Sequence, residues 1–225
     1  MVTYYSLGAA KKLNEIVMAG SHDAAITQGS GNAQTQDLDI FDQASAGVRI
    51  FDIRITGAIV KSGSGGDVGS LKAYHGQSLG GGGTQSVTDL RTGQVGNMTI
   101  KPMKLGTYGM SLSKILTDAA KFVAKEGTEF VILKFDKCDN WPGIAEACIV
   151  LLGDKICKIR TNLNTKTLDE LKGKVIVLFS VEGRTSLGWS TPPEVSGILA
   201  FENLKEGGSF NANFAGLQYY GKGGT

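Results

Sequence analysis

The stretch GVRIFDIR, residues 47–54, decides the fold class of this chain. It contains the apolar residues Val48, Ile50, Phe51 and Ile53, which suit a buried strand, and it ends in the charged residues Asp52 and Arg54. Strand alternation places these two side chains on the same side. In a parallel sheet the carboxyl ends of the strands form one edge, where ligands bind. The stretch therefore predicts a parallel α/β sheet with charged side chains gathered at its edge.

Short apolar runs alternate with helical patterns on either side of this stretch, which is the signature of βαβ units. The predicted strands are Ile16–Ala19, Val48–Ile55, Leu71–His75, Phe130–Phe135, Val175–Phe179, Ile198–Phe201 and Leu217–Tyr220. The predicted helices are Leu38–Ala46, Ser111–Glu126 between an N-cap at Ser111 and a stop at Gly127, Ile144–Leu152, and a short helix opened by the capping box Thr167–Glu170 and ended by Gly173. We expect one β/α barrel domain over residues 1–225, with a doubly wound open sheet as the alternative.

Composition excludes several classes of protein. A formal charge of +2 over 225 residues gives no support to sequence-independent nucleic-acid binding. No apolar run is long enough to span a bilayer, and no signal peptide is visible at the start of the sequence. The 32 glycines predict a chain rich in loops, above all at Ser62–Ser70 and in the polar stretch from Gly80–Gly83 to about Lys104.

The three cysteines, Cys138, Cys148 and Cys157, lie close together in the sequence. An odd number argues against a disulfide framework, and no histidine lies near enough to suggest zinc. We expect ordinary thiols, while one bridge plus one free thiol stays open.

The chain has only two histidines, and each lies at the end of a predicted strand. His22 follows the first strand and His75 ends the third, while Arg54 ends the second. In a parallel barrel these side chains could converge at one mouth. Two imidazoles and a guanidinium suggest acid–base chemistry on a phosphodiester, with one His taking a proton, the other giving one, and the Arg neutralising the phosphate.

Three motifs in order carry a family resemblance: IVMAGSHD (residues 16–23), QASAGVRIFDIR (43–54) and YHG (74–76). They resemble the X-region of phosphatidylinositol-specific phospholipase C, most closely the bacterial, metal-independent branch. The resemblance continues more weakly through residues 129–136 and 173–179. It implies a distorted TIM barrel of the phospholipase-C-like phosphodiesterase type.

The resemblance also implies site residues and a reaction. His22 resembles the general base acting on the inositol 2-hydroxyl, His75 the general acid that protonates the diacylglycerol oxygen, and Asp23 the carboxylate paired with His75. The products would be diacylglycerol and inositol 1,2-cyclic phosphate, followed by slower opening of the cyclic ester. Asp52, Lys134 and Asp136 are the expected substrate-binding residues, with Lys134 and Asp136 matching the family's pair that grips inositol hydroxyls.

Arg54 distinguishes the two branches of this family. Calcium-dependent relatives carry a carboxylate at this position, as a hard cation requires. A guanidinium would instead occupy the place of the metal, so we expect no metal and no cofactor. The expected partner is phosphatidylinositol or a glycan-anchored lipid at a membrane surface, reached by secretion or another delivery route.

The sequence departs from the family pattern toward its end. Val175–Ser180 lacks the Arg expected at its end, with Arg184 four residues later, and the late acidic–aromatic pair has only residues 201–204 as a candidate. The carboxylate expected on the last strand to orient His22 has no match, so the barrel is expected to lack that strand. These gaps keep open an alternative, a catalytically silent module that binds phosphoinositides or a protein. Trp141 and Trp189 follow predicted strands and suit either a membrane interface or core packing.

Overall fold

The computed structural model describes residues 3–29, 33–61, 67–78, 83–88, 95–100, 103–158, 163, 166–188, 198–200 and 219–222. Its first sheet contains six strands, all parallel to their neighbours, in the order β10-β9-β8-β2-β1-β11. In chain order these are β1 (Met18–Ser21), β2 (Val48–Ile53), β8 (Val131–Phe135), β9 (Val175–Phe179), β10 (Ile198–Ala200) and β11 (Tyr219–Lys222). The predicted α/β class and parallel sheet are confirmed. No pairing within the described ranges joins β10 to β11, so the barrel itself stays a prediction.

The helices that cover this sheet form where the sequence supplies apolar faces and caps. They are α1 (Ile40–Ala46), α2 (Leu112–Glu126), α3 (Trp141–Leu152), α4 (Leu168–Leu171) and α5 (Val181–Ser186), with 3-10 turns at Tyr5–Leu7, Leu13–Glu15 and Gly153–Lys155. The Ser111 hydroxyl caps α2 by accepting from the Lys114 amide at 3.2 Å, and Gly127 follows its end with φ 53°. The capping box at Thr167 and Glu170 is also present. Both predicted caps are therefore confirmed.

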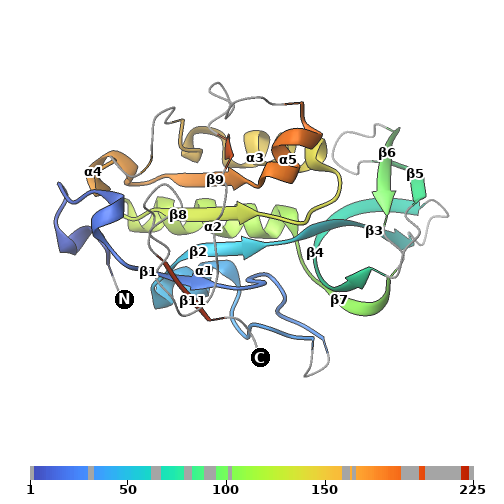
Figure 1. Cartoon of the computed structure of the whole chain (residues 1–225), viewed down its shortest axis with the longest axis horizontal. Helices are drawn as coiled ribbons and strands as arrows, with labels where there is room; N and C mark the ends of the chain where they lie inside the picture. Colours follow the sequence, from blue (N-terminus) through green and yellow to red (C-terminus); the bar gives the residue numbers. More distant parts are fainter. Residues whose placement is uncertain are drawn as a thin grey trace.

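Strand alternation divides the core into two layers. Odd-numbered residues such as Phe51, Leu133 and Val177 pack against α1, α2 and α3, which lie behind the sheet in Figure 1. Even-numbered residues such as Ile50 and Ile132 pack on the other face, against the amino-terminal segment and α4. Asp52 and Lys134 continue this second face toward the carboxyl ends of β2 and β8. This second face is thus apolar near the strand starts and charged near the strand ends.

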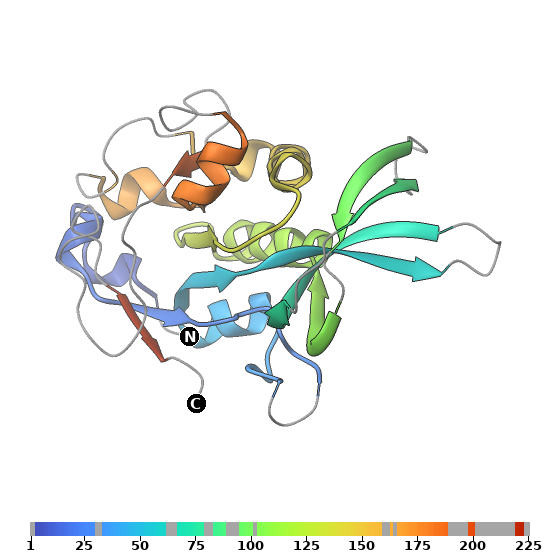
Figure 2. The ribbon, with the colours of Figure 1, turned by 45° about the vertical axis from the view of Figure 1, so that its right-hand side comes forward.

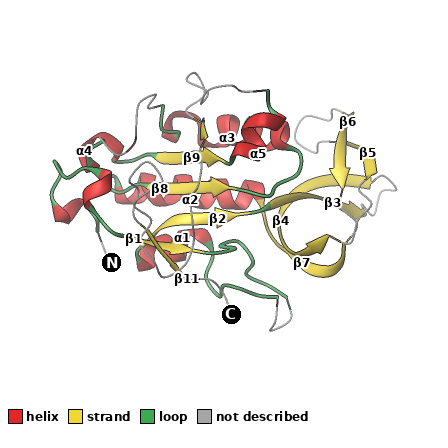
Figure 3. Cartoon of the chain, in the orientation of Figure 1, coloured by secondary structure: helices red, strands yellow, loops and turns green. Residues whose placement is uncertain are grey.

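A second, antiparallel-rich sheet lies beyond the carboxyl ends of β2, β8 and β9 (Figure 3). It contains β3 (Ile55–Lys61), β4 (Asp67–Ser78), β5 (Gly83–Thr88), β6 (Val95–Ile100) and β7 (Met103–Ser111), with β7 paired to β4. Figure 2 shows β3 to β6 projecting from the body of the molecule. We call this sheet the arm.

The arm corrects three sequence predictions. The strand predicted over Val48–Ile55 is two strands, because the chain leaves β2 after Ile53 and enters the arm as β3 at Ile55. The predicted barrel strand Leu71–His75 is the middle of β4, which pairs antiparallel with β3 and β7. The polar stretch after Gly83 contains β5, β6 and the start of β7 rather than loop alone. These strands pair mainly antiparallel, and antiparallel strands lack the continuous apolar run by which buried parallel strands are found in a sequence.

Candidate active site

The first two site residues lie in a tight turn directly after β1. Asp23 adopts φ 44°, a left-handed conformation that Asp tolerates better than most residues. The Thr35 hydroxyl donates to the Asp23 carbonyl at 2.8 Å, the Gln36 side chain donates to the His22 carbonyl at 3.0 Å, and the Ala24 amide donates to the Asp52 carbonyl at 2.9 Å. These three bonds fix the turn that aims His22 and Asp23 at the edge of the sheet.

Asp52 and Arg54 extend from the end of β2 and from the residue that follows it. The Asp52 side chain is 3% exposed and Arg54 is 25% exposed, so the carboxylate is the deeper of the two. Arg54 Nε lies 3.2 Å from Asp23 Oδ1 without the alignment of a hydrogen bond, and its Nη2 lies 3.8 Å from Asp52 Oδ2. The guanidinium therefore neutralises two buried carboxylates through charge contacts while one side stays open to solvent.

The sequence predicts His75 at the end of a parallel strand, and this prediction is wrong. His75 comes from the arm. It lies within β4, opposite Thr107 of β7. Its Nδ1 is 2.5 Å from Asp23 Oδ2, a short contact with a carboxylate that is itself 1% exposed. The same carboxylate oxygen is 3.3 Å from His22 Nε2. Asp23 thus joins the two imidazoles across the boundary between the two sheets.

Lys134 and Asp136 lie at the end of β8 on the same face. Lys134 Nζ is 2.7 Å from Asp52 Oδ1 and 4.0 Å from Asp136 Oδ2. Lys134 is nearly buried, while the Asp136 side chain is 29% exposed. The structure therefore brings together all seven predicted site residues, with two buried carboxylates behind the imidazoles and Arg54.

This arrangement suits proton transfer beside a negatively charged ligand. The Nδ1 contact with Asp23 leaves Nε2 of His75 as the nitrogen available to a ligand, and the partly exposed Arg54 supplies positive charge at the other oxygen of the same carboxylate. Acid–base groups need this combination of carboxylate support and solvent access.

The geometry also permits a test for a metal ion. His22, Asp23 and Asp52 offer ligand atoms within 4.8 Å of one another. The carboxylates of this set already contact Arg54 and Lys134, which would repel a divalent cation. Calcium also takes six to eight oxygen ligands, more than these residues supply. The site residues do not fit a calcium ion, and the expectation of a metal-free site stays a prediction.

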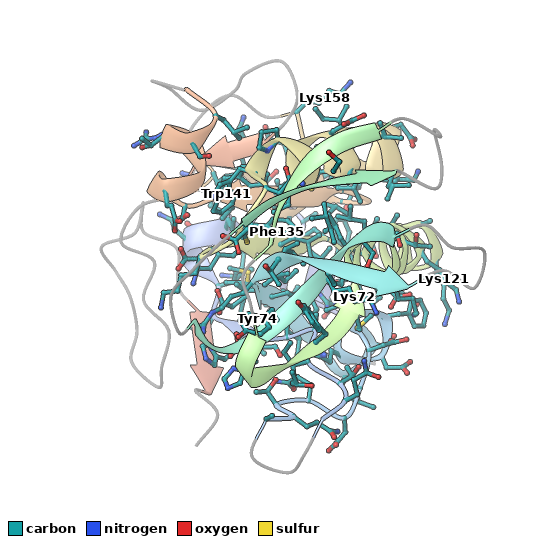
Figure 4. All side chains as sticks on the ribbon, turned by 90° about the vertical axis from the view of Figure 1, so that its right-hand side faces the viewer. Lys72, Tyr74, Lys121, Phe135, Trp141 and Lys158 are labelled. Carbon is teal, nitrogen blue, oxygen red and sulfur yellow. The ribbon has the colours of Figure 1, made fainter. Side chains whose placement is uncertain are left out.

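A polar cavity of about 300 Å³ opens beside Arg54. Its other lining residues are Ile55, Thr56, Tyr74, Gly76, Lys137, Asp139 and Glu182. The Thr56 hydroxyl donates to Asp139 Oδ2 at 2.9 Å. Figure 4 labels Tyr74, one of these residues, on β4 in front of the body of the molecule. The mixture of cations, carboxylates and hydroxyls suits a ligand rich in hydroxyl groups.

The sequence features outside this set have structural roles. All three cysteines are free and buried, and burial raises the pKa of the Cys138 and Cys148 thiols, which excludes them as nucleophiles at neutral pH. Trp141 is 3% exposed with its ring centre 5.3 Å from that of Phe179, so the membrane-interface alternative for this residue is wrong. Figure 4 shows Trp141 within the fold. Trp189 and residues 201–204 lie outside the described residues.

Sequence reasoning missed four polar residues that line the cavity, Thr56, Lys137, Asp139 and Glu182. None of the four belongs to the quoted motifs. Glu182 lies near where the family pattern expects an Arg, and the position of α5 directly after β9 was the signal that could have placed it. Arg184 lies two residues further along the same helix and is not among the residues that line the cavity.

The fold and this edge of charged groups define an α/β class with a candidate acid–base site at the carboxyl ends of a parallel sheet. No family model and no curated protein matches the sequence. Solved structures do: two structures of the phosphatidylinositol-specific phospholipase C from Staphylococcus aureus match with TM-scores of 0.51 and 0.53, 21% and 22% identity, and 77% and 79% of this chain covered. A structure of the Listeria monocytogenes enzyme matches with a TM-score of 0.48 at 20% identity over 77% of the chain.

The likeness to the Staphylococcus aureus structures shows that the chain shares the fold of a bacterial phospholipase C. The matched part spans 50% and 52% of those two chains, and 54% of the Listeria monocytogenes chain. No described helix has both the length and the apolar character needed to cross a bilayer.

Proposed function

We propose that this chain is a phospholipase-C-like phosphodiesterase that cleaves phosphatidylinositol, or its glycan-anchored forms, into diacylglycerol and inositol 1,2-cyclic phosphate. One observation carries the proposal: Asp23 Oδ2 contacts His75 Nδ1 at 2.5 Å and His22 Nε2 at 3.3 Å, with Arg54 beside it. Two proton-transfer groups and a cation around one point are what an internal attack on a phosphodiester requires.

In the first step His22 accepts the proton of the inositol 2-hydroxyl, whose oxygen attacks the phosphorus. The bond from phosphorus to the glycerol oxygen breaks, and His75 donates its proton to that oxygen. Arg54 stabilises the negative charge that develops on the phosphoryl oxygens. In the slower second step His75 takes a proton from water, and His22 returns one to the inositol oxygen.

The cavity beside Arg54 supports an inositol headgroup as the substrate. Lys134 and Asp136 would bind ring hydroxyls at the sheet edge, and Thr56, Tyr74 and Asp139 offer further donors and acceptors. The matched Staphylococcus aureus structures include one concerned with membrane binding by that enzyme. We infer that this chain likewise meets its lipid at a membrane surface.

Phosphorus NMR of phosphatidylinositol vesicles incubated with the protein, with and without EDTA, tests the proposal. We expect a cyclic phosphate signal that grows at the same rate in both samples. Vesicle binding without any new phosphorus signal, at every calcium concentration, would overturn the enzyme assignment in favour of a silent lipid-binding module. A signal that disappears with EDTA would overturn the metal-free mechanism.

A further inference from the structure

His22, the proposed general base, needs a carboxylate that fixes the orientation of its ring and its tautomer. A neutral imidazole accepts a proton on only one nitrogen, and the partner of the other nitrogen decides which one. The four described residues of β11, Tyr219–Lys222, include no carboxylate, although β11 lies next to β1 with Lys222 opposite Ser21. The support for His22 must be sought elsewhere among the described residues.

The register of the sheet places Asp52 beside His22. Ser21 pairs with Phe51 across β1 and β2. The residues that follow them in the sequence, His22 and Asp52, therefore lie side by side. Asp52 pairs in turn with Lys134 across β2 and β8. The ends of β2 and β8 and the turn after β1 therefore carry one row of side chains, Asp52, Lys134 and His22, at the charged end of this face.

Along this row the two oxygens of Asp52 make charge contacts without the alignment of hydrogen bonds, each with a different nearest neighbour, and Oδ2 also lies 3.8 Å from Arg54 Nη2. Asp52 Oδ2 lies 3.3 Å from His22 Nδ1, and Asp52 Oδ1 lies 2.7 Å from Lys134 Nζ. Lys134 and Asp52 are 4% and 3% exposed, so the carboxylate is held between a buried ammonium and the ring. The bond from the Ala24 amide to the Asp52 carbonyl also ties the turn that carries His22 to this residue.

Asp23 is less suited to orient His22. Its Oδ2 makes the shorter contact with His75, 2.5 Å against 3.3 Å, and the His22 atom that it meets is Nε2. If Nε2 carried the proton, His22 would have to accept the hydroxyl proton on Nδ1, which faces the buried Asp52. The proton of the neutral ring therefore belongs on Nδ1, toward Asp52, and Nε2 is left for the substrate.

We propose that Asp52 is the positioning residue of His22: it holds the imidazole in the Nδ1–H tautomer, itself held by Lys134, and takes the place of a carboxylate on the last strand. This inference rests on the proposed function and deepens it. It moves Asp52 from the substrate-binding residues to those that support the base. In serine proteases, loss of the equivalent carboxylate leaves the wrong tautomer and lowers kcat about 10⁴-fold.

NMR of protein with ¹⁵N-labelled histidine tests the tautomer without any turnover. The two histidines give two spin systems, which His75→Ala assigns. In the unmodified chain, at a pH where both rings are neutral, His22 is expected to carry its proton on Nδ1. In Asp52→Asn the amide group donates to Nδ1, and the proton is expected on Nε2. Asp136→Asn is the matched control: it removes a carboxylate that lies 4.0 Å from the same Lys134 ammonium while Asp52 is kept, and it should leave the tautomer unchanged.

Kinetics give the second readout. Asp52→Asn should lower kcat about 10²–10⁴-fold with KM changed less than about threefold, because the base is mispositioned while the headgroup is still bound. A rise in KM at constant kcat would overturn the proposal and leave Asp52 as a substrate-binding residue. An Nε2–H tautomer in the unmodified chain would also overturn it, even if Asp52→Asn failed to fold. The expected tautomers without any phospholipid cleavage would defeat the proposed function alone.

Discussion

At the scale of single residues, the two imidazoles have different environments although they share Asp23. His75 is 33% exposed and comes from β4, while His22 is 19% exposed and lies between Asp23 and Asp52. The proposed roles follow this difference: the more enclosed ring suits the base, and the more exposed ring suits proton donation to a departing lipid. Both are required in the proposed reaction.

His22→Ala and His75→Ala should each lower phosphatidylinositol cleavage by at least about 10²–10⁴-fold, since each removes one proton-transfer group. Release of diacylglycerol from vesicles measures the effect. Lys155→Ala, in the 3-10 turn after α3, is the control and should keep full activity. Wild-type rates in either histidine variant would refute the assignment of that histidine.

Arg54→Asp should lower the rate measured in EDTA by about 10²–10³-fold, because it removes the cation that stabilises the developing charge. The substitution also places a third carboxylate beside Asp23 and Asp52, so a stability measurement must accompany the assay. Arg54→Lys keeps the charge without the planar fork and should lose less activity. Equal rates for Arg54→Asp and the unmodified protein would show that another group meets the phosphate.

Single site residues were the part of the structure that the sequence predicted best. The spacing of Asp52 and Arg54 places both on one side of a strand, and the structure brings them within 3.8 Å of one another. The pairing of Asp52 with His22 could not be read in this way. It depends on the register between β1 and β2, which shifts between Ala19 and Gly20. The sequence of either strand alone does not show this register.

At the scale of elements, β7 connects the arm to both histidines. The Met110 amide of β7 donates to the Ala25 carbonyl at 2.9 Å, and Ala25 lies two residues after Asp23. A Cβ atom on Gly109 would overlap that same carbonyl oxygen, and one on Gly106 would lie 2.5 Å from the His75 carbonyl oxygen. The two glycines let β7 approach the backbone on both sides of the site.

Gly109→Ala should therefore destabilise the protein by about 1–3 kcal/mol and reduce cleavage, because β7 must move away from the turn that holds His22. Urea denaturation and the vesicle assay measure the two effects. Gly96→Ala in β6 is the matched control, since nothing lies within 4 Å of its added Cβ atom. Equal stability of the two variants would contradict the close packing of β7.

Elements were predictable where burial determines them. The run Val175–Phe179 is apolar throughout and forms β9 with the predicted bounds, and α2 begins and ends at its predicted caps. The sequence GTQSVT of β5 offers no such signal, because pairing with β6 satisfies its backbone without an apolar face. His75 lies in a strand, as predicted, but that strand is antiparallel to its neighbours β3 and β7 and not a parallel barrel strand, because the short run Leu71–His75 does not determine its partners.

At the scale of the whole molecule, a buried ion pair lies at the starts of β2 and β8, at the opposite ends of these strands from the site. Arg49 Nη2 lies 2.7 Å from Glu129 Oε2, and both side chains are fully buried. The guanidinium lies between the rings of Tyr4 and Phe122, 4.9 and 4.8 Å from their centres. Glu129 Oε1 also accepts a hydrogen bond from the Tyr5 amide at 3.1 Å. One pair thus joins the amino-terminal segment, α2, β2 and the start of β8.

Glu129→Gln should lower the free energy of unfolding by about 3–5 kcal/mol, because it leaves a buried guanidinium without its countercharge. Cleavage per folded molecule should stay at the wild-type level, since the site lies at the other end of the strands. Lys172→Ala, which removes an exposed partner of Asp169, is the control and should change stability little. A variant as stable as the control would contradict the structural role of the pair.

The division of the two histidines between sheets has a thermodynamic consequence. A ligand that touches both His22 and His75 can bind only when the arm is docked against the parallel sheet, so its binding energy also opposes separation of the two. By linkage, saturating cyclic phosphate should slow amide hydrogen exchange in β4 and β7 more than in β9. Binding of the cyclic phosphate would then stabilise the docked arm. A substitution that weakens the docking of the arm would lower the affinity for the cyclic phosphate even if every residue that contacts the ligand is unchanged.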